Sequence, residues 1–187
     1  MANTGYRIHP PLGPPDCPWY PMIRGFTTPP ELAAYLGGEL HGDEVYIGRV
    51  YDDDCYLVGT AIPSKAICIY LSKKLEIKST DTYDILLCDC GHPLDFLPMG
   101  LDSNLLFVAG GDDDECLYCA RVVDGENTYY GWADKATNAV YIPRESSVGP
   151  NKVKEGYDIM IHKYLDRLCI CPMPPQPRPI PPQPPTF

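Results

Sequence analysis

Short runs of valine, isoleucine, leucine and tyrosine alternate along the middle of the chain with clusters of glycine, aspartate, serine and proline. Apolar runs of this length, bounded by turn residues at regular spacing, are typical of antiparallel β-strands. Helical patterns are weak and predict only a turn or two at 30–35 and another at 163–169. The pattern therefore predicts an all-β protein, with strands at 44–51, 66–71, 82–87, 116–123, 139–143 and 157–162.

The same series of runs occurs twice. Identical residues recur at offsets of 72 to 74 residues, which requires only short insertions or deletions in loops. Ordered self-similarity of this kind indicates a duplicated structural unit. We place the first copy at 31–90, a linker at 91–103 and the second copy at 104–164. The recurring positions are Gly37, Gly38, Tyr46, Arg49, Val50, Asp52, Gly59, Ala61, Tyr83, Asp84 and Ile85, which return as Gly110, Gly111, Tyr118, Arg121, Val122, Asp124, Gly131, Ala133, Tyr157, Asp158 and Ile159.

Proline marks the two ends of the chain. Of the 22 prolines, eight lie in 1–30 and nine in 172–187. Because proline fixes φ and removes a backbone donor, we expect an extended N-terminal arm at 1–30 and a C-terminal segment at 165–187 with a polyproline tail. Aromatic anchors and a basic-x-x-Pro-x-x-Pro pattern are features that partner grooves bind. The predicted partner-binding residues of the arms are Trp19, Tyr20, Phe26, Arg178, Pro181 and Pro184.

The motifs of the two copies resemble those of the DM-nine repeat family. The first copy reads LGGELHGDEVYIGR at 36–49, GTAIPSK at 59–65 and YDIL at 83–86, and the second copy matches at 109–112, 117–121, 140–143 and 157–160. The resemblance implies an all-β fold of two tandem antiparallel sandwich-like units related by a pseudo-twofold axis. It also implies mannose binding, as in the invertebrate lectins of the family, which often self-associate.

In those lectins an acid of the opening motif and a lysine after the later glycine hold the sugar hydroxyls. Here the acid positions carry Glu39 and Asp112, and the lysine positions carry Thr60 and Trp132. A hexose needs carboxylates that accept from its hydroxyl groups and often an aromatic ring against its C–H face. The alternative interpretation is that these side chains are hydrated loop carboxylates and a half-buried tryptophan. The candidate carbohydrate-binding residues are Glu39, His41, Thr60, Asp112, Asp113 and Trp132.

Each copy also repeats an arginine near its first strand and an aspartate near its last strand. An arginine and a carboxylate that form a partly buried pair can hold two strands in register. We therefore predict two structural pairs, Arg49 with Asp84 and Arg121 with Asp158.

Charge and motif content exclude several classes of function. The net charge of −10 opposes binding to nucleic acid and to anionic membrane surfaces, and no apolar run is long enough to span a bilayer. No nucleophile elbow, phosphate-binding loop or zinc-protease motif occurs, so we predict that the protein is not an enzyme and needs no metal or cofactor. The nine cysteines, an odd number, together with the lack of an apolar leader, favour reduced thiols and a cytoplasmic location.

These observations support a non-enzymatic, lectin-like protein that recognises mannose-type glycans. The alternative is an intracellular structural protein whose proline-rich arms dock the repeats into a larger assembly. Homo-oligomerisation is compatible with both interpretations.

Overall fold

The computed structural model describes residues 19–22, 27–29, 38–87, 94–98, 100–101, 106–112, 115–144 and 150–162. The two predicted helical turns, at 30–35 and 163–169, lie outside these ranges. So do the predicted partner-binding residues Phe26, Arg178, Pro181 and Pro184, and the candidate Asp113.

Nearly all of the described chain is extended. Its 15 strands are β1 (Trp19–Met22), β2 (Glu39–Leu40), β3 (Asp43–Glu44), β4 (Tyr46–Asp52), β5 (Cys55–Ile62), β6 (Ile67–Leu71), β7 (Ile77–Thr80), β8 (Tyr83–Leu86), β9 (Leu94–Leu97), β10 (Val108–Gly111), β11 (Cys116–Asp124), β12 (Asn127–Asp134), β13 (Ala139–Tyr141), β14 (Lys152–Val153) and β15 (Asp158–His162). Within the described ranges the helical structure is one 3-10 turn, η1 (Pro63–Lys65). The all-β prediction is confirmed, and no helix of the described residues is long and apolar enough to cross a membrane.

The six predicted strands correspond to β4, β6, β8, β11, β13 and β15, with ends that differ by a few residues. The sequence did not predict β5 and β12, which are eight residues long and lie at the centre of each copy. Both contain a glycine in mid-strand, Gly59 and Gly131, and glycine is normally depleted in strands. Here the glycine has a packing role, because a Cβ on Gly59 would lie 2.5 Å from the carbonyl oxygen of Ile69 on the neighbouring strand.

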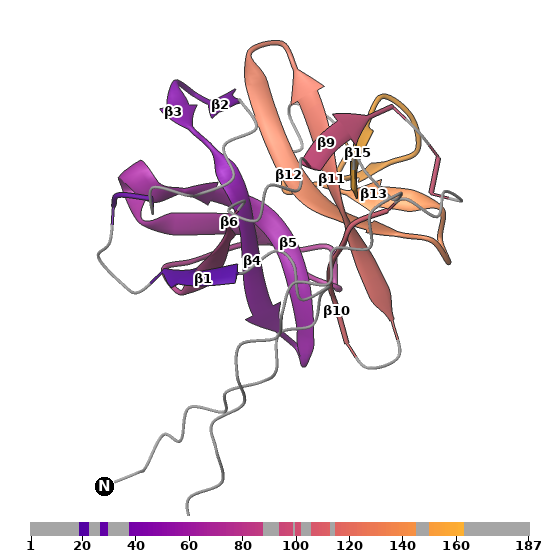
Figure 1. Ribbon diagram of the computed structural model, residues 1–187, viewed down its shortest axis with the longest axis horizontal. Helices are drawn as coiled ribbons and strands as arrows, with labels where there is room; N and C mark the ends of the chain where they lie inside the picture. The colour runs from indigo at the N-terminus through magenta and orange to yellow at the C-terminus, as the bar shows by residue number, and fades with distance from the viewer. Residues whose placement is uncertain are drawn as a thin grey trace, which may run out of the picture.

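The two copies lie side by side (Figure 1), and their strands follow the same antiparallel order. In the first copy the order is β1-β8-β4-β5-β6-β7, and in the second it is β9-β15-β11-β12-β13-β14. The register also repeats, since Arg49 lies opposite Asp84 and Arg121 opposite Asp158. From here on, the first copy means β1 to β8 and the second copy means β9 to β15.

This arrangement corrects two boundaries of the sequence analysis. The segment Trp19–Met22 belongs to the folded body as the edge strand β1 rather than to a free arm, and β9 lies within the predicted linker 91–103. Among the described strands β1 pairs only with β8, and Pro21 is tolerated there because an edge strand can lack a backbone donor.

The two copies are joined by a reciprocal exchange of their opening segments. Glu39 in β2 pairs with Asn127 in β12, which we call the first seam, and Gly111 in β10 pairs with Tyr56 in β5, which we call the second seam. All strands therefore belong to one hydrogen-bonded network rather than to two separate sheets. The finer expectation, two sandwiches related by a pseudo-twofold axis, stays a prediction.

The repeated glycines of the opening motifs explain how close the copies approach at these seams. A Cβ on Gly38 would lie 2.7 Å from the Thr128 side chain, and a Cβ on Gly110 would lie 2.3 Å from the Tyr56 carbonyl oxygen. Both glycines belong to the repeated glycine pair of the opening motifs, at 37–38 and 110–111, and the residues that they approach, Tyr56 and Thr128, are 72 residues apart. Each opening motif thus needs glycine because the central strand of the other copy occupies the space of a side chain.

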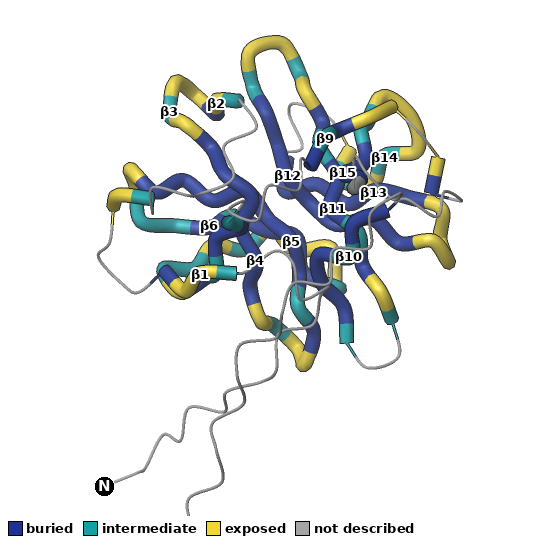
Figure 2. Tube along the Cα trace, in the orientation of Figure 1, coloured by how far each residue is buried: buried dark blue, intermediate teal, exposed yellow. Residues whose placement is uncertain are grey.

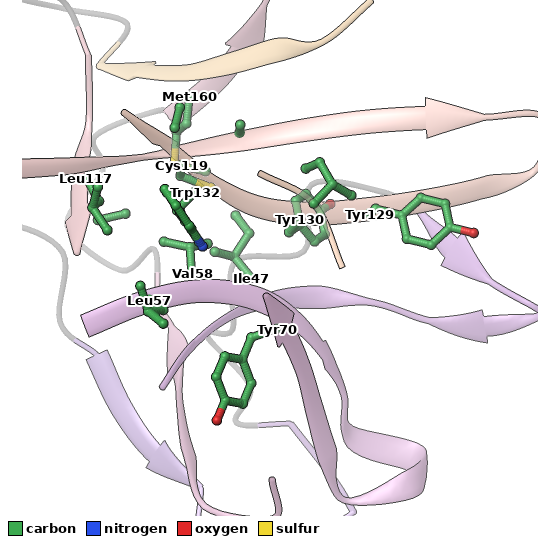
Figure 3. Packing of buried hydrophobic residues seen from close by; sticks show 14 of the residues in the cluster. Ile47, Leu57, Val58, Tyr70, Leu117, Cys119, Tyr129, Tyr130, Trp132 and Met160 are labelled. Atoms are coloured by element: carbon green, nitrogen blue, oxygen red, sulfur yellow. The ribbon is translucent and has the colours of Figure 1, made fainter. Parts of the chain in front are cut away.

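The apolar core is continuous between the copies. Buried segments run along the central strands of both, while the hairpin tips are exposed (Figure 2). In the close-up, Ile47, Leu57 and Val58 of the first copy lie near Leu117 and Trp132 of the second (Figure 3). A shared core of this kind makes the stability of each copy depend on the other.

Candidate functional site

The structure brings the members of each predicted arginine–aspartate pair together. Arg49 donates from Nε (3.2 Å) and Nη2 (2.8 Å) to Oδ2 of Asp84, and Arg121 donates from the same atoms (3.2 and 2.7 Å) to Oδ2 of Asp158. In each pair these two bonds end on the same carboxylate oxygen, Oδ2. The pairs differ in burial, because the Arg49 side chain is 3% exposed and that of Arg121 is 22% exposed. Burial lowers the pKa of Arg49, and Asp84 opposes this effect.

An aromatic ring from the edge strand covers each of these arginines. The guanidinium carbon of Arg49 lies 4.4 Å from the ring centroid of Trp19 in β1, and that of Arg121 lies 4.5 Å from the ring of Phe96 in β9. Such cation–π contacts add to the ion pairs. Trp19, predicted as a partner anchor, is therefore half-buried against its own body. Tyr20, its neighbour, is 47% exposed.

The sequence also holds a signal for this contact. The segment WYPM at 19–22 recurs as FLPM at 96–99, an offset of 77 residues. This offset is longer than the 72 to 74 residues of the other repeated positions. The repeat of these two segments places Trp19 and Phe96 at equivalent positions of the duplicated unit.

Two of the candidate sugar contacts are buried between the copies, which corrects their predicted role. The Thr60 hydroxyl is fully buried, donates to the Tyr130 carbonyl oxygen (3.1 Å) and accepts from the Tyr130 N–H (2.8 Å). Trp132 donates from Nε1 to the Leu71 carbonyl oxygen (2.9 Å) and stacks on Tyr141 with ring centroids 4.0 Å apart. The polar group of each side chain is hydrogen-bonded to the backbone of another strand, so neither is available to a sugar.

The first seam carries the exposed candidates. Glu39 and His41 are exposed on the β2–β3 hairpin, and the His41 N–H donates to Oδ1 of Asn127 across the seam (2.9 Å). On the same hairpin Asp43 lies 2.6 Å from Nζ of Lys65, whose side chain is half-exposed. The hydrogen bond from Lys65 is the main cause that lowers the pKa of Asp43. Around this hairpin the structure thus places the exposed Glu39 and His41, the Asp43–Lys65 ion pair and the half-buried Asn127 of the second copy.

The second seam is less open to a ligand. Asp112 is half-buried, and its Oδ1 accepts from the Glu115 N–H (2.9 Å), which closes the turn after β10. Glu115 in turn forms an ion pair with Lys73 of the first copy. The carboxylate of Asp112 therefore stabilises the turn, and Glu39 is the better exposed of the two opening-motif acids.

Among the described residues, no group of three or more His, Cys, Asp or Glu side chains is placed to hold a metal ion. In the acidic run of the β4–β5 turn, Asp52 pairs with Lys78 and Asp53 with Lys74, while Asp54 accepts from the Tyr51 hydroxyl. Neighbouring carboxylates thus point to different partners.

The described thiols differ sharply in exposure. Cys116 is exposed, whereas Cys55, Cys68 and Cys119 are buried and free. Burial raises the pKa of Cys55 to about 11 and raises the pKa of Cys68 and Cys119 further. Cys116 and Cys119 lie on opposite faces of β11, one exposed and one buried, so they cannot clasp one ion together. Buried thiols with raised pKa values are chemically inert.

A concavity on the first copy was not predicted from the sequence. It has a volume of 720 Å³ and is lined by Tyr51, Tyr56, Tyr70 and Tyr83, with Met22 and Thr80, and the Arg49–Asp84 pair borders it. We call it the tyrosine hollow. Sequence reasoning could not find it because its residues come from β1 and from β4 to β8, which meet only when the sheet curls.

No protein-family model matches the chain, and no curated protein matches it.

Proposed function

We propose that this protein is a non-enzymatic carbohydrate-recognition protein of the DM-nine type that binds mannose-type glycans at the first seam. The observation that supports the proposal is the reciprocal pairing of the copies, which sets the exposed Glu39 and His41 of one copy beside the half-buried Asn127 of the other.

The groups at the first seam suit the hydroxyls of a neutral sugar. The Glu39 carboxylate has two acceptor oxygens for a pair of neighbouring hydroxyls. The contact from the His41 N–H fixes Oδ1 of Asn127, which leaves the amide NH2 group as a donor for a sugar oxygen. Lys65 adds a second donor, since one ammonium group carries three protons and only one is needed for Asp43. The proposed binding residues are therefore Glu39, His41, Lys65 and Asn127.

Retention on a mannan column tests the proposal. The intact protein should be retained at neutral pH and released by free mannose. Glu39→Gln should reduce affinity about tenfold, since hydrogen bonds to charged groups are worth roughly 1.5–3 kcal/mol. Glu155→Gln is the matched control, because Glu155 is an exposed glutamate between β14 and β15, and this variant should bind like the wild type. Failure of the intact protein to bind mannan, or full retention of Glu39→Gln, would contradict the proposal.

The structural alternative depends on the proline-rich ends. Trp19, one of its predicted anchors, packs over Arg49 and is not free for a partner, whereas Tyr20 remains exposed. The alternative predicts that deletion of 165–187 abolishes incorporation into a larger assembly, whether or not the protein binds mannan. Gel filtration of native extracts that contain either the intact or the truncated protein distinguishes the two functions.

A further inference from the structure

The tyrosine hollow has the size and lining of a small-molecule site. Ligand pockets commonly enclose about 300–1,000 Å³ and carry apolar and aromatic walls with a few polar groups. The hollow has 720 Å³, with Tyr56 from β5, Tyr70 from β6 and Met22 from the edge strand β1 in its walls.

The charged groups around the hollow are already neutralised by protein partners. Arg49 is paired with Asp84 and lies 4.3 Å from the Tyr56 ring centroid. The Tyr70 hydroxyl donates to Asp52, and burial raises the pKa of Tyr70 to about 12, so this tyrosine is uncharged at neutral pH. A charged ligand would lose its hydration without gaining a counter-ion, so the hollow suits a neutral ligand.

One polar group of the wall has no partner. Tyr83 is 4% exposed, and its buried hydroxyl makes no hydrogen bond within the part of the chain that the structure describes. Leaving a buried donor unsatisfied costs roughly 1–3 kcal/mol. Such groups are rare in folded proteins, and each one calls for an explanation. A ligand with an acceptor atom at Tyr83 would supply the missing bond.

Three of the four tyrosines in the wall are particular to the first copy, whereas Tyr83 recurs as Tyr157. Tyr51, Tyr56 and Tyr70 stand at positions where the second copy carries non-aromatic residues at the same offset of 72. The corresponding residues are Val123, Thr128 and Ile142. Because the shared architecture is built without these three rings, the fold itself does not require them at these positions.

We propose that the tyrosine hollow is a binding site for a neutral, ring-bearing small molecule that accepts a hydrogen bond from the Tyr83 hydroxyl. The site is separate from the first seam and does not depend on glycan binding there. The rings of Tyr56 and Tyr70 pack against the ligand ring, and offset or edge-to-face packing of aromatic rings is favourable.

Fluorescence titration of the intact chain with 6-propionyl-2-(dimethylamino)naphthalene tests this proposal. The probe is a neutral naphthalene ketone whose emission shifts to the blue in an apolar site. We expect saturable binding at one site, and free mannose should not displace the probe. Tyr83→Phe should weaken binding about fivefold, because it removes one hydrogen bond to the ketone. Tyr118→Phe alters a half-buried tyrosine of the second copy outside the hollow and should leave the affinity unchanged.

A second variant blocks the hollow instead of changing its chemistry. Thr80 is a half-buried wall residue on β7, and Thr80→Trp should weaken binding at least tenfold by filling the space. Tyr83→Phe removes a single oxygen atom, so it keeps the test valid if Thr80→Trp does not fold. The proposal is overturned by absence of saturable binding to the wild type, by displacement of the probe with mannose, or by unchanged affinity in either hollow variant.

Discussion

The two arginine–aspartate pairs allow the contribution of one ion pair to stability to be compared with that of its equivalent in the other copy. We predict that Asp84→Asn destabilises the protein more than Asp158→Asn does. The two pairs have nearly the same hydrogen-bond lengths, so the difference must come from burial: the Arg49 side chain is 3% exposed and the Arg121 side chain 22% exposed. Asparagine keeps the shape and one acceptor oxygen but removes the charge.

The expected magnitudes follow from the surroundings of each guanidinium. Removal of one partner of a fully buried pair costs about 3–5 kcal/mol, whereas an exposed pair is worth about 1 kcal/mol or less. Asp84 is itself 26% exposed, and Trp19 and Tyr56 still lie over Arg49, so water and the two rings offset part of the loss. We therefore expect about 2 kcal/mol for Asp84→Asn and about 1 kcal/mol for Asp158→Asn.

Urea unfolding of the wild type and both variants measures this difference. With a slope of about 2 kcal/mol per molar urea, the midpoint should fall by about 1 M for Asp84→Asn and about 0.5 M for Asp158→Asn. Adding Arg49→Met to Asp84→Asn should recover part of the loss, because the unpaired buried charge is removed. An equal or larger loss in Asp158→Asn would refute the argument that burial sets the strength of these pairs.

Four further outcomes follow from the packing. Gly131→Ala should cost more than 3 kcal/mol in urea unfolding, because its Cβ would meet a carbonyl oxygen at 2.0 Å, whereas Gly125→Ala, in open space at φ +60°, should cost about 1 kcal/mol. Trp19→Ala should lower stability by about 2 kcal/mol, and a thermal melt that matches the wild type would contradict the placement of β1. Burial opposes ionisation of Asp134, but hydrogen bonds from Thr137 and Ala136 outweigh burial and lower its pKa. The contribution of Asp134 to stability should therefore persist above pH 4 and be lost as the pH falls further. Asp134→Asn should flatten this part of the curve of unfolding free energy against pH. Cys116→Ser should remove one fast-reacting thiol from a titration of the native protein, whereas Cys119→Ser should remove none.

The limits of the sequence reasoning are clearest at Thr60 and Trp132. Their positions in the repeat could be read from the chain, and the paired strands around them follow from the alternating pattern. Whether a strand residue faces solvent or the other copy is decided by how the copies pack, which the pattern of one strand does not contain. The pairing of Arg49 with Asp84 could be predicted because both residues lie within one copy. The same pair therefore recurs in the other copy, as Arg121 with Asp158.

Trp19 illustrates a different limit. Its surroundings are rich in proline, and composition alone predicts an extended arm. An extended segment is also what an edge strand requires, and proline is compatible with the outer side of such a strand. Composition therefore gave the local conformation of this segment correctly but not the surface against which it lies.

The exchange of opening segments has a consequence for how this protein can change over time. A substitution at Gly38 must suit Thr128, and one at Gly110 must suit Tyr56, so each copy restricts the sequence of its twin. Neither half can be lost or swapped for a foreign repeat without leaving a central strand of the remaining half incomplete.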